Sequence, residues 1–553
     1  MNTSQPRSGT ASAESSPQRG GAKVPRPDPS WLRQAHVPEA RGRVERYLAE
    51  LLASIEGCEP DKVDLAEPII GRADSLALAE FKTTVDRELG LRLPMSLFFE
   101  SASPASLAAT IVDEIRTAAD STAPAGSGDA KAGSGGTVRA RSGGTVPAGR
   151  SGRMSVAEMD ACAALPASIA ATEPAEQPER APRGTLLTGA TGFVGAFLLA
   201  ELLQQRQGDV YCLVRASSPQ RALERILANL DSYGIDAGRH RQRIVAVPGD
   251  LTEPGFGLPD NAFADLHARC GDIVHCGAVV NWTYPYQALE RANVYGTREV
   301  LRLATGYGPV RPVHFISTVG VFSSVEYQGE VVYEAQLPTE SGPLAVGYAQ
   351  SKWVAEQMTR TAHERGVPTT IHRINTGGDS RTGAFNRLDH LSMMLKGCVE
   401  AGIAPQDVNI YLQPAPIDYV AASVVAAARR PELDGCTLHL VNEAEMSWAQ
   451  LFDIVREFGY PMATTTFEDW RDRVSAPGSG TTALLGLVPF LVDSIDDMRV
   501  PRFDSTSTRH ALTGTAPACP PLSAQLVHTY LEGFISAGFI GPPKAAVRPL
   551  RTE

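Results

Sequence analysis

The fold of this chain is decided by one glycine-rich stretch, Thr188-Gly189-Ala190-Thr191-Gly192-Phe193-Val194-Gly195. A short apolar run, 185–187, precedes it, and a helix-forming segment, 196–203, follows it. A strand, a glycine turn and a helix in that order form a phosphate-binding site, because glycines let the backbone approach a pyrophosphate and the helix N-terminus offers free N–H groups. The spacing is Gly-x-x-Gly-x-x-Gly, whereas the commonest dinucleotide fingerprint is Gly-x-Gly-x-x-Gly. Such a turn also forms for purely steric reasons, so residues further along the chain must decide its meaning.

Length and composition limit the classes of protein that fit. A chain of 553 residues is too long for one core and predicts two or three domains. It carries 51 Lys and Arg against 62 Asp and Glu, a net charge of −11 without a basic cluster, which excludes a nucleic-acid-binding surface. The eight cysteines form no C-x-x-C pair and no metal-ligand spacing with histidines, so we expect reduced thiols and no metal site.

No targeting segment is visible in the sequence. The polar N-terminus lacks the apolar core of a signal peptide, and the longest apolar run, 483–492, is far shorter than a membrane span. We therefore expect a cytoplasmic protein that does not contact membranes.

The first part of the chain predicts a small helical domain behind a disordered leader. Residues 1–35 are polar and rich in Ser, Pro and Gly, which is typical of disorder. Residues 36–118 then show apolar positions at helical spacing over 40–55, 75–89 and about 104–115, with Asp74 suited to cap the second helix. We expect a four-helix bundle here.

A sharp change of composition separates this bundle from the rest. Residues 119–153 consist mainly of Gly, Ser, Ala and Pro, and Ser-Gly-Gly-Thr-Val occurs twice, at 134–138 and 142–146. Such a segment has too few large apolar residues to bury a core, so we expect a flexible linker. From 154 to 545 the chain is globular again.

The globular part alternates strand-like runs with helical patterns. The strand-like runs are 185–188, 209–214, 244–247, 272–275, 313–317 and 369–372. This alternation predicts an α/β fold of the Rossmann type, with a doubly wound parallel sheet over about 183–380. After about residue 383 the rhythm changes to helices and short segments, so a helical substrate subdomain is expected mainly over 381–545.

Residues after the expected strands indicate which dinucleotide binds. Arg215 follows the second strand, where an NAD site would place an acidic residue on the ribose 2′-hydroxyl. Arginine accommodates a 2′-phosphate instead, which favours NADPH, and Arg225 on the next helix is placed to close over the same phosphate. The alternative is that both arginines are merely solvated. Asp250 follows the third strand at the expected position of the adenine amino group.

The expected cofactor site combines these positions with the turn. The segment 278–280 follows the fourth strand and is expected close to the cofactor ribose. The full predicted set is Gly189, Thr191, Gly192, Phe193, Val194, Gly195, Arg215, Arg225, Asp250, Leu251, Ala278, Val279, Val280 and Asn293.

A catalytic set follows from spacing. Tyr348 and Lys352 are four residues apart and share one face of a helix. A lysine charge beside a phenol favours the phenolate, so we expect Lys352 to lower the pKa of Tyr348. Thr318 ends the fifth strand, where its hydroxyl would bond a substrate oxygen. The alternative interpretation, an exposed helix face, is common for Tyr-x-x-x-Lys but less so beside a nucleotide turn.

The helical domain resembles a known family. The segment Gly71-Arg72-Ala73-Asp74-Ser75-Leu76, with Leu93-Pro94, Phe98-Phe99 and 103–108, resembles the acyl carrier domains of polyketide and nonribosomal peptide assembly lines. The resemblance covers nearly all of 40–117. It implies that Ser75 carries a 4′-phosphopantetheine arm, attached by a phosphopantetheinyl transferase. Without the resemblance, Asp74 and Ser75 would be interpreted as a helix cap.

The larger domain resembles another family. The glycine turn with Thr318, Tyr348 and Lys352 matches the extended short-chain dehydrogenase/reductases. More narrowly, 212–216, Asn281-Trp282, Pro285-Tyr286 and 293–297 look like the thioester reductase domains that end some assembly lines and carboxylic acid reductases. The resemblance runs from about 155 to 540 and implies that Thr318, Tyr348 and Lys352 are catalytic. For Asn293 it implies a proton relay, with a buried structural asparagine as the alternative.

Together these features predict NADPH-dependent reductive release of an acyl thioester held on Ser75, as an aldehyde or further as an alcohol. The expected partners are the acyl substrate, a phosphopantetheinyl transferase, and a polyketide or peptide synthase or acyl ligase that loads the carrier. The tether and carrier favour a monomer. Three alternatives stay open: a non-redox cyclase on the same fold, a reductase of a free small molecule, and a non-catalytic carrier and docking protein.

Overall fold

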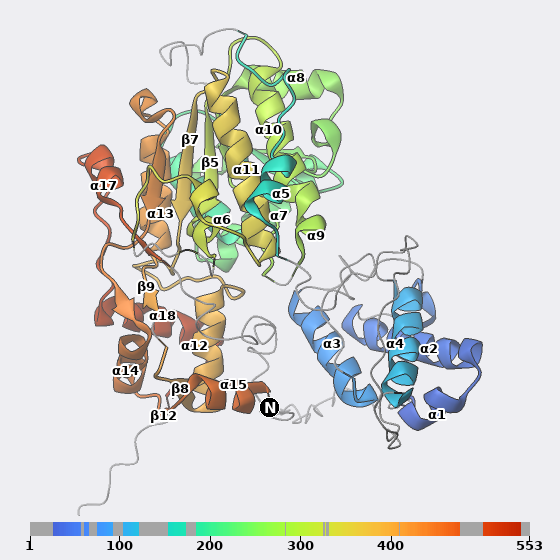
Figure 1. Ribbon diagram of the computed structural model, residues 1–553. Helices are drawn as coiled ribbons and strands as arrows, with labels where there is room; N and C mark the ends of the chain where they lie inside the picture. The colour runs from blue at the N-terminus through green and yellow to red at the C-terminus, as the bar shows by residue number, and fades with distance from the viewer. Residues whose placement is uncertain are drawn as a thin grey trace, which may run out of the picture. The chain divides into compact units, whose positions relative to one another are not determined.

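A computed structural model describes residues 26–56, 60–65, 75–91, 103–120, 153–172, 184–282, 284–324, 327, 331–408, 410–475 and 501–543 (Figure 1). The chain divides into two compact units. One comprises Met1–Arg72, Thr84–Leu93 and Ala102–Ala130, and the other comprises Ala73–Thr83, Pro94–Ser101 and Lys131–Glu553.

The N-terminal part is helical, as expected. Its elements are α1 (Pro29–Gln34), α2 (Val37–Glu56), the 3-10 turn η1 (Pro60–Lys62), α3 (Ser75–Leu89) and α4 (Pro104–Asp120). Helices α1 and α2 both pack against α4. The apolar positions predicted for α2 and α3, among them Leu48, Phe81 and Val85, are buried. Helix α3 begins at Ser75, as the sequence predicts, whereas the expected cap Asp74 lies outside the described residues.

The expectation of disorder through residue 35 is wrong for the last part of the leader. Pro29–Gln34 forms α1, because the Asp28 carboxylate accepts a 2.8 Å bond from Ser30 N and Leu32 is fully buried. Residues 1–25 and most of the expected linker, 121–152, lie outside the described residues.

A seven-stranded parallel sheet organises the second unit, in the order β10-β7-β5-β4-β1-β2-β3. Its strands are β1 (Gly184–Thr188), β2 (Val210–Val214), β3 (Ile244–Pro248), β4 (Cys270–His275), β5 (Val313–Thr318), β7 (Thr369–Ile374) and β10 (Thr437–Leu440). The six strands expected from the sequence are all present, and the doubly wound α/β fold is confirmed. Strand β10 is an addition that the sequence pattern does not predict.

Helices cover both faces of this sheet (Figure 1). One face carries α5 (Val156–Cys162), α8 (Asp260–Arg269), α9 (Tyr286–Glu290), α10 (Gly296–Thr305) and α11 (Gly347–Glu364). The other carries α6 (Phe193–Gln205), α7 (Pro219–Ser232) and α13 (Ile417–Ala427). Strand β1 lies between β2 and β4, so the strand order reverses there, and the crevice at the carboxyl ends of β1 and β4 is where a ligand binds in such sheets.

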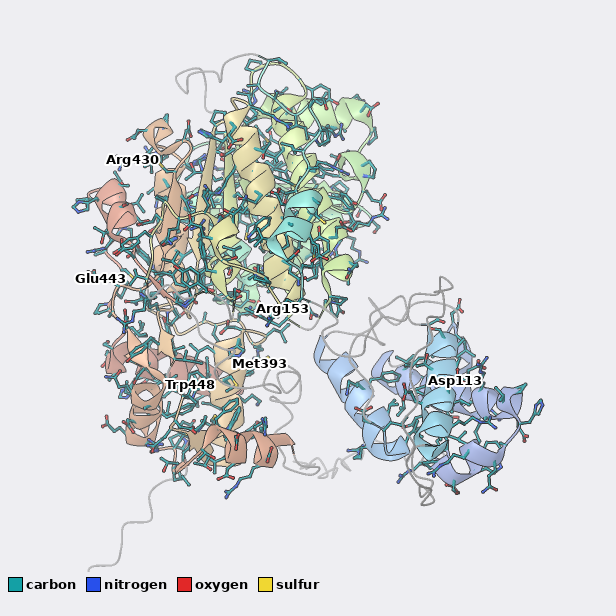
Figure 2. All side chains as sticks on the ribbon, in the orientation of Figure 1. Asp113, Arg153, Met393, Arg430, Glu443 and Trp448 are labelled. Atoms are coloured by element: carbon teal, nitrogen blue, oxygen red, sulfur yellow. The ribbon has the colours of Figure 1, made fainter. Side chains whose placement is uncertain are left out.

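A second hydrophobic core lies beyond the sheet and contains Trp448, with Met393 packed against it (Figure 2). It is built by α12 (His390–Ala401), α14 (Trp448–Phe458), α15 (Phe467–Ser475) and α18 (Ala524–Ser536). Short strands accompany it: β8 (Ile403–Pro405) pairs with β12 (Ala463–Thr465), and β9 (Tyr411–Leu412) pairs with β11 (Met446–Ser447). This is the helical subdomain expected after residue 381.

The boundary of that subdomain is less simple than expected. Helix α13 packs on α6, β10 joins the main sheet, α17 (Thr506–Leu512) packs on β10, and β13 (Arg502–Phe503) pairs with β6 (Val331–Val332). Parts of 381–545 therefore return to the nucleotide-binding half. The apolar face of α13 is buried against α6, which the local rhythm of the sequence does not reveal.

Membrane spans and metal clusters are both absent from the described part of the chain. Among the residues that the structure describes, none of the helices combines the length and apolar character that a bilayer crossing requires. Within the same residues, no three His, Cys, Asp or Glu side chains gather as metal ligands would.

Candidate active site

Two of the three glycines in the turn are required by the protein itself. Gly189 has φ +81°, and a Cβ there would lie 2.8 Å from Gly277 N at the end of β4. A Cβ on Gly195 would collide with Gly189 O. The backbones of the turn, of α6 and of the segment after β4 therefore touch, and only glycine fits at these two positions.

The middle glycine is different. A Cβ on Gly192 would meet only Gly189 O, at 3.4 Å, which is ordinary contact. Gly192 is exposed and caps α6 without a side-chain hydrogen bond, so the first N–H groups of this helix remain available. Thr191 and Val194 are half-buried and Phe193 is buried. Free N–H groups at an uncapped helix start fit the pyrophosphate of a dinucleotide.

The two arginines meet at the end of β2. Both are exposed, and the Arg225 guanidinium donates a hydrogen bond to the Arg215 carbonyl oxygen. Sequence reasoning missed Asn229, one turn after Arg225 on α7. Its Nδ2 donates to Ala190 O at 3.2 Å and Gly192 O at 3.1 Å, so α7 holds the glycine turn. The four-residue spacing from Arg225 was the available signal.

Asp250 and Leu251 follow β3, as expected. Asp250 is half-buried, and its Oδ1 accepts bonds of 2.9 Å from both Thr252 N and Thr252 Oγ1. Leu251 packs against the segment after β4, because a Cβ on Gly277 would lie 2.6 Å from Leu251 Cδ1. Asp250 therefore holds its own loop and keeps one oxygen for a further donor.

Asn293 lies in η5 (Arg291–Tyr295), a single turn of π-helix. Its Oδ1 accepts from Val279 N at 2.7 Å, and its Nδ2 donates to Val279 O at 3.0 Å and to Ser351 Oγ at 2.9 Å. Both amide protons are thus used, which favours the structural alternative over a relay through this side chain. Ala278 is half-buried and Val280 is 58% exposed.

The three predicted catalytic residues come from β5 and α11, which pack together. Lys352 is buried, with Nζ donating to Ile316 O at 2.6 Å and lying 3.9 Å from the centre of the Phe315 ring. Thr318 Oγ1 accepts from Gly320 N at 3.1 Å, and the hydroxyl can still donate. The Tyr348 ring lies 5.7 Å from that of Trp282.

The expectation that Lys352 lowers the pKa of Tyr348 is wrong for this structure. Burial raises the pKa of Tyr348, and Cys276 raises it further. Burial also lowers the pKa of Lys352 to about 8. The lysine ammonium is bonded to Ile316 O, so desolvation determines the state of the phenol. Tyr348 is therefore protonated at neutral pH, the form that a proton donor needs.

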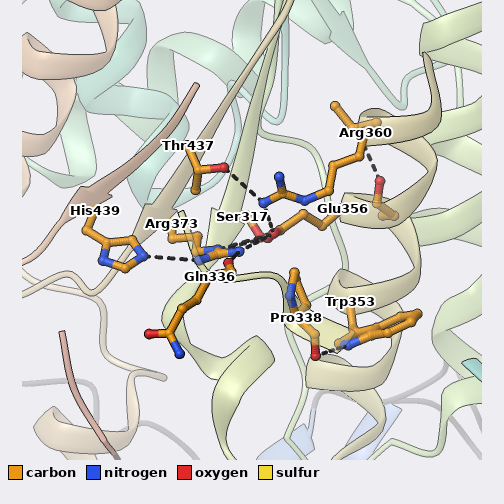
Figure 3. Close-up of polar contacts among 11 residues, drawn as sticks. Ser317, Gln336, Pro338, Trp353, Glu356, Arg360, Arg373, Thr437 and His439 are labelled. Atoms are coloured by element: carbon orange, nitrogen blue, oxygen red, sulfur yellow. Dashed lines mark hydrogen bonds and ion pairs between the residues drawn. The ribbon is translucent and has the colours of Figure 1, made fainter. Parts of the chain in front are cut away.

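A buried ion-pair cluster holds α11 four residues beyond Lys352 (Figure 3). Glu356 Oε1 lies 2.8 Å from Arg373 Nη2 and 3.0 Å from Arg360 Nη2, and Ser317 Oγ donates to Glu356 Oε2 at 2.6 Å. Glu356 and Arg373 are fully buried. Burial alone would raise the pKa of Glu356, but the two arginines lower it to about 2. The cluster fixes α11 against β5 and β7.

Known protein families match both the helical N-terminal region and the larger α/β region of the chain. A family model described as male sterility protein, an NAD-binding domain, matches residues 187–424, and one described as phosphopantetheine attachment site matches 46–111. A linear gramicidin synthase of Brevibacillus parabrevis is 35% identical over 402 residues, which cover 72% of this chain and 7% of that protein. The chain thus spans a small part of this curated relative.

Solved structures match over most of the chain. The terminal R domain of the myxalamid PKS-NRPS pathway is 40% identical, with a TM-score of 0.66, covering 70% of this chain and all of that one. A thiolation-reductase di-domain of an archaeal nonribosomal peptide synthetase covers 90% of this chain and 98% of that one, with a TM-score of 0.60. At 20% identity it shows the fold alone.

These domains imply phosphopantetheine and NAD(P)H as cofactors. With the parallel sheet, the uncapped glycine turn and the Tyr348–Lys352 pair in place, the chain belongs to the family of terminal reductase domains of peptide and polyketide synthases, preceded by a phosphopantetheine attachment domain.

Proposed function

We propose that this chain releases an acyl group from its own carrier domain as an aldehyde, by NADPH-dependent reduction of the thioester. One observation carries the proposal: a phosphopantetheine attachment domain, with Ser75 at the start of α3, is joined to a reductase in which Thr318, Tyr348 and Lys352 are gathered on the packed pair β5 and α11. The family assignment supports the reaction class.

The residues that would hold the cofactor are those of the crevice between β1 and β4. The N–H groups in the first turn of α6, from Phe193 onward, would bind the pyrophosphate, and Arg215 with Arg225 would bind the 2′-phosphate. Asp250 would face the adenine, and 278–280 with Lys352 would flank the ribose. NADPH bound there supplies a hydride to the carbonyl carbon.

Residues of the chain then stabilise the negative charge that develops on the carbonyl oxygen. The hydroxyls of Thr318 and Tyr348 donate hydrogen bonds to it, and Tyr348, a phenol at neutral pH because burial raises its pKa, gives up its proton. The bond between the carbonyl carbon and the pantetheine sulfur would then break, and the arm would leave as a free thiol. The balance is one thioester, one hydride and one proton in, and one aldehyde and one thiol out; a second hydride and proton give the alcohol.

The proposal includes partners and setting. An upstream polyketide or peptide synthase or acyl ligase would load the carrier, and a phosphopantetheinyl transferase would attach the arm to Ser75. The described cysteines are free thiols, which supports the reducing cytoplasm as the location. We propose that the chain acts as a monomer.

The test loads Ser75 with an acyl-pantetheine, adds NADPH or NADH, and follows cofactor oxidation together with product mass. Oxidation of NADPH with release of an aldehyde or alcohol is expected, and it should be abolished in Ser75→Ala. Arg215→Ala should reduce the preference for NADPH over NADH, whereas Arg221→Ala, exposed on the helix that follows and paired with Glu224, should not. Product release without NADPH oxidation would point to a non-redox cyclase. Activity that survives Ser75→Ala would point to a reductase of a free small molecule. No release at all would point to a non-catalytic carrier.

A further inference from the structure

A line of hydrogen bonds runs through His275, a buried residue to which the proposed reaction assigns no role. At one end Gly277 N donates to Thr188 Oγ1 at 2.8 Å, and Thr188 Oγ1 lies 2.7 Å from His275 Nδ1. At the other end His275 Nε2 lies 3.0 Å from Thr297 Oγ1, which donates to Asn293 O at 2.6 Å. The line joins the ends of β1 and β4 to η5 and α10.

The donors and acceptors on this line fix one tautomer of His275. Thr297 uses its only proton on Asn293 O, so its oxygen must accept from Nε2–H of His275. Nδ1 then has no proton and accepts from the hydroxyl of Thr188, whose oxygen is free to accept from Gly277 N. Every bond has one donor and one acceptor. The two ring nitrogens therefore do different things.

The line continues to the catalytic helix. Asn293, one turn before Thr297, donates to Ser351 Oγ at 2.9 Å, and Ser351 Oγ donates to Tyr348 O at 2.8 Å. The opposite end, Thr188, directly precedes Gly189, whose backbone touches Gly277. His275 thus stands between the start of the nucleotide turn and the backbone of Tyr348.

The environment keeps His275 neutral. It is 1% exposed, and burial, with Lys352 as a second cause, lowers its pKa to about 3. It does not change charge between pH 5 and 9, so its contribution is geometric.

We propose that His275 is a positioning residue with two separable tasks: Nδ1 holds Thr188 and with it the nucleotide turn, while Nε2 holds Thr297 and through Asn293 the helix that carries Tyr348. This inference rests on the proposed function for its second task. Loss of the Nδ1 bond is expected to weaken NADPH binding, and loss of the Nε2 bond to slow the turnover of bound substrate.

Two substitutions separate the tasks. His275→Asn places an amide oxygen near the position of Nδ1 and removes the bond to Thr297, whereas His275→Gln places an amide N–H near Nε2 and removes the bond to Thr188. For His275→Asn we expect kcat to fall about tenfold with the Kd for NADPH nearly unchanged, and for His275→Gln the Kd to rise about tenfold with kcat nearly unchanged. The Kd is measured by fluorescence titration of the full-length holo-protein, and kcat with an acyl-loaded carrier at saturating NADPH.

The controls guard against a general loss of folding. Thr297→Val replaces the hydroxyl with a methyl group and should lower kcat as His275→Asn does. Thr297→Ser keeps the hydroxyl and should keep kcat near the wild-type value. The same Asn and Gln substitutions at His314, buried on β5 outside the line, should show no such split. Equal changes in Kd and kcat for both His275 variants, or none, would overturn the proposal. A wild-type protein that binds NADPH but reduces no thioester would refute the proposed function, while the Kd comparison would still test the first task.

Discussion

Helix α11 is held in two different ways along its length. In its first turns the contacts are hydrogen bonds to uncharged groups: Ser351 accepts from Asn293, and the Lys352 ammonium donates to a backbone carbonyl. One turn further on, Glu356 is locked between Arg373 and Arg360. Glu356 lies eight residues beyond Tyr348, and the pKa of the phenol is set by burial and Cys276, so the ion pairs anchor the helix without setting the protonation of the phenol. The residues that anchor α11 and the residues proposed to react thus lie in different turns of the helix.

The largest effect should come from Tyr348→Phe, which tests the reacting end. Loss of the proton donor should lower kcat by roughly 10²- to 10⁴-fold, with the urea midpoint of unfolding unchanged, because no charge is removed. Single-turnover reduction of an acyl-loaded carrier measures it, with Tyr333→Phe, 55% exposed, as the control. Retention of most of the activity would mean that the proton comes from another group.

The holding end is tested by Glu356→Gln. The substitution leaves Arg373 buried without its counter-charge, so the free energy of unfolding should fall by about 3–5 kcal/mol. Urea denaturation of the full chain measures it, and Glu364→Gln, exposed at the end of the same helix, should change it by under about 0.5 kcal/mol. If Glu356→Gln instead lowered kcat and left the free energy of unfolding unchanged, Glu356 would act in catalysis and not as an anchor of α11.

As pH falls, the buried histidine and the buried glutamate should each reduce the stability of the folded protein, in two separate pH ranges. Burial lowers the pKa of His314 in the folded protein to about 4, so stability is lost as pH falls from about 6.5, where the unfolded histidine starts to bind a proton. The pKa of Glu356 is lowered to about 2, so its contribution is present above about 4.5 and lost only as pH falls towards 2.

Replacing His314 should therefore flatten the first window alone. His314→Leu is expected to recover about 2 kcal/mol of the stability lost between pH 7 and pH 5. The check is urea unfolding at each pH, with exposed His363→Gln as the control. An unchanged pH dependence in His314→Leu would assign the loss to other groups.

The smallest effect is expected for Arg360→Gln. Arg360 is 19% exposed, and without it Glu356 keeps Arg373 and the Ser317 hydroxyl. The free energy of unfolding should fall by about 1 kcal/mol, read from the same denaturation curves. A loss equal to that of Glu356→Gln would show that both arginines are needed to neutralise the carboxylate.

Local pattern was enough for much of the fold. The six strands with apolar runs and the start of α3 at Ser75 follow from residues close together in the sequence. Strand β10 did not, because its four residues, Thr437–Leu440, become a strand only by pairing with β7. Helix α1 was missed for a similar reason: its polar surroundings hide the one buried leucine, Leu32.

The candidate site shows the same limit. Motif spacing located the glycine turn, Thr318, Tyr348 and Lys352, and the structure sets their expected elements side by side. The direction of the pKa shift of Tyr348 was wrong, because the spacing of charged residues does not reveal how deeply a phenol is buried. His275 and Thr297 carry no motif in which their hydrogen-bond partners are adjacent, and only the fold joins them.

The late return of β10 to the sheet has a consequence for synthesis. His439 on this strand bonds Arg373, and its Nδ1 lies 2.7 Å from Asp504 O. During translation the sheet edge therefore stays open until β10 has left the ribosome, and His439 gains its contact with Asp504 only when the chain through Asp504 has followed. A nascent chain paused earlier would expose the open edge of β7, so folding should depend on uninterrupted synthesis through this region, or on a chaperone that covers the edge until it closes.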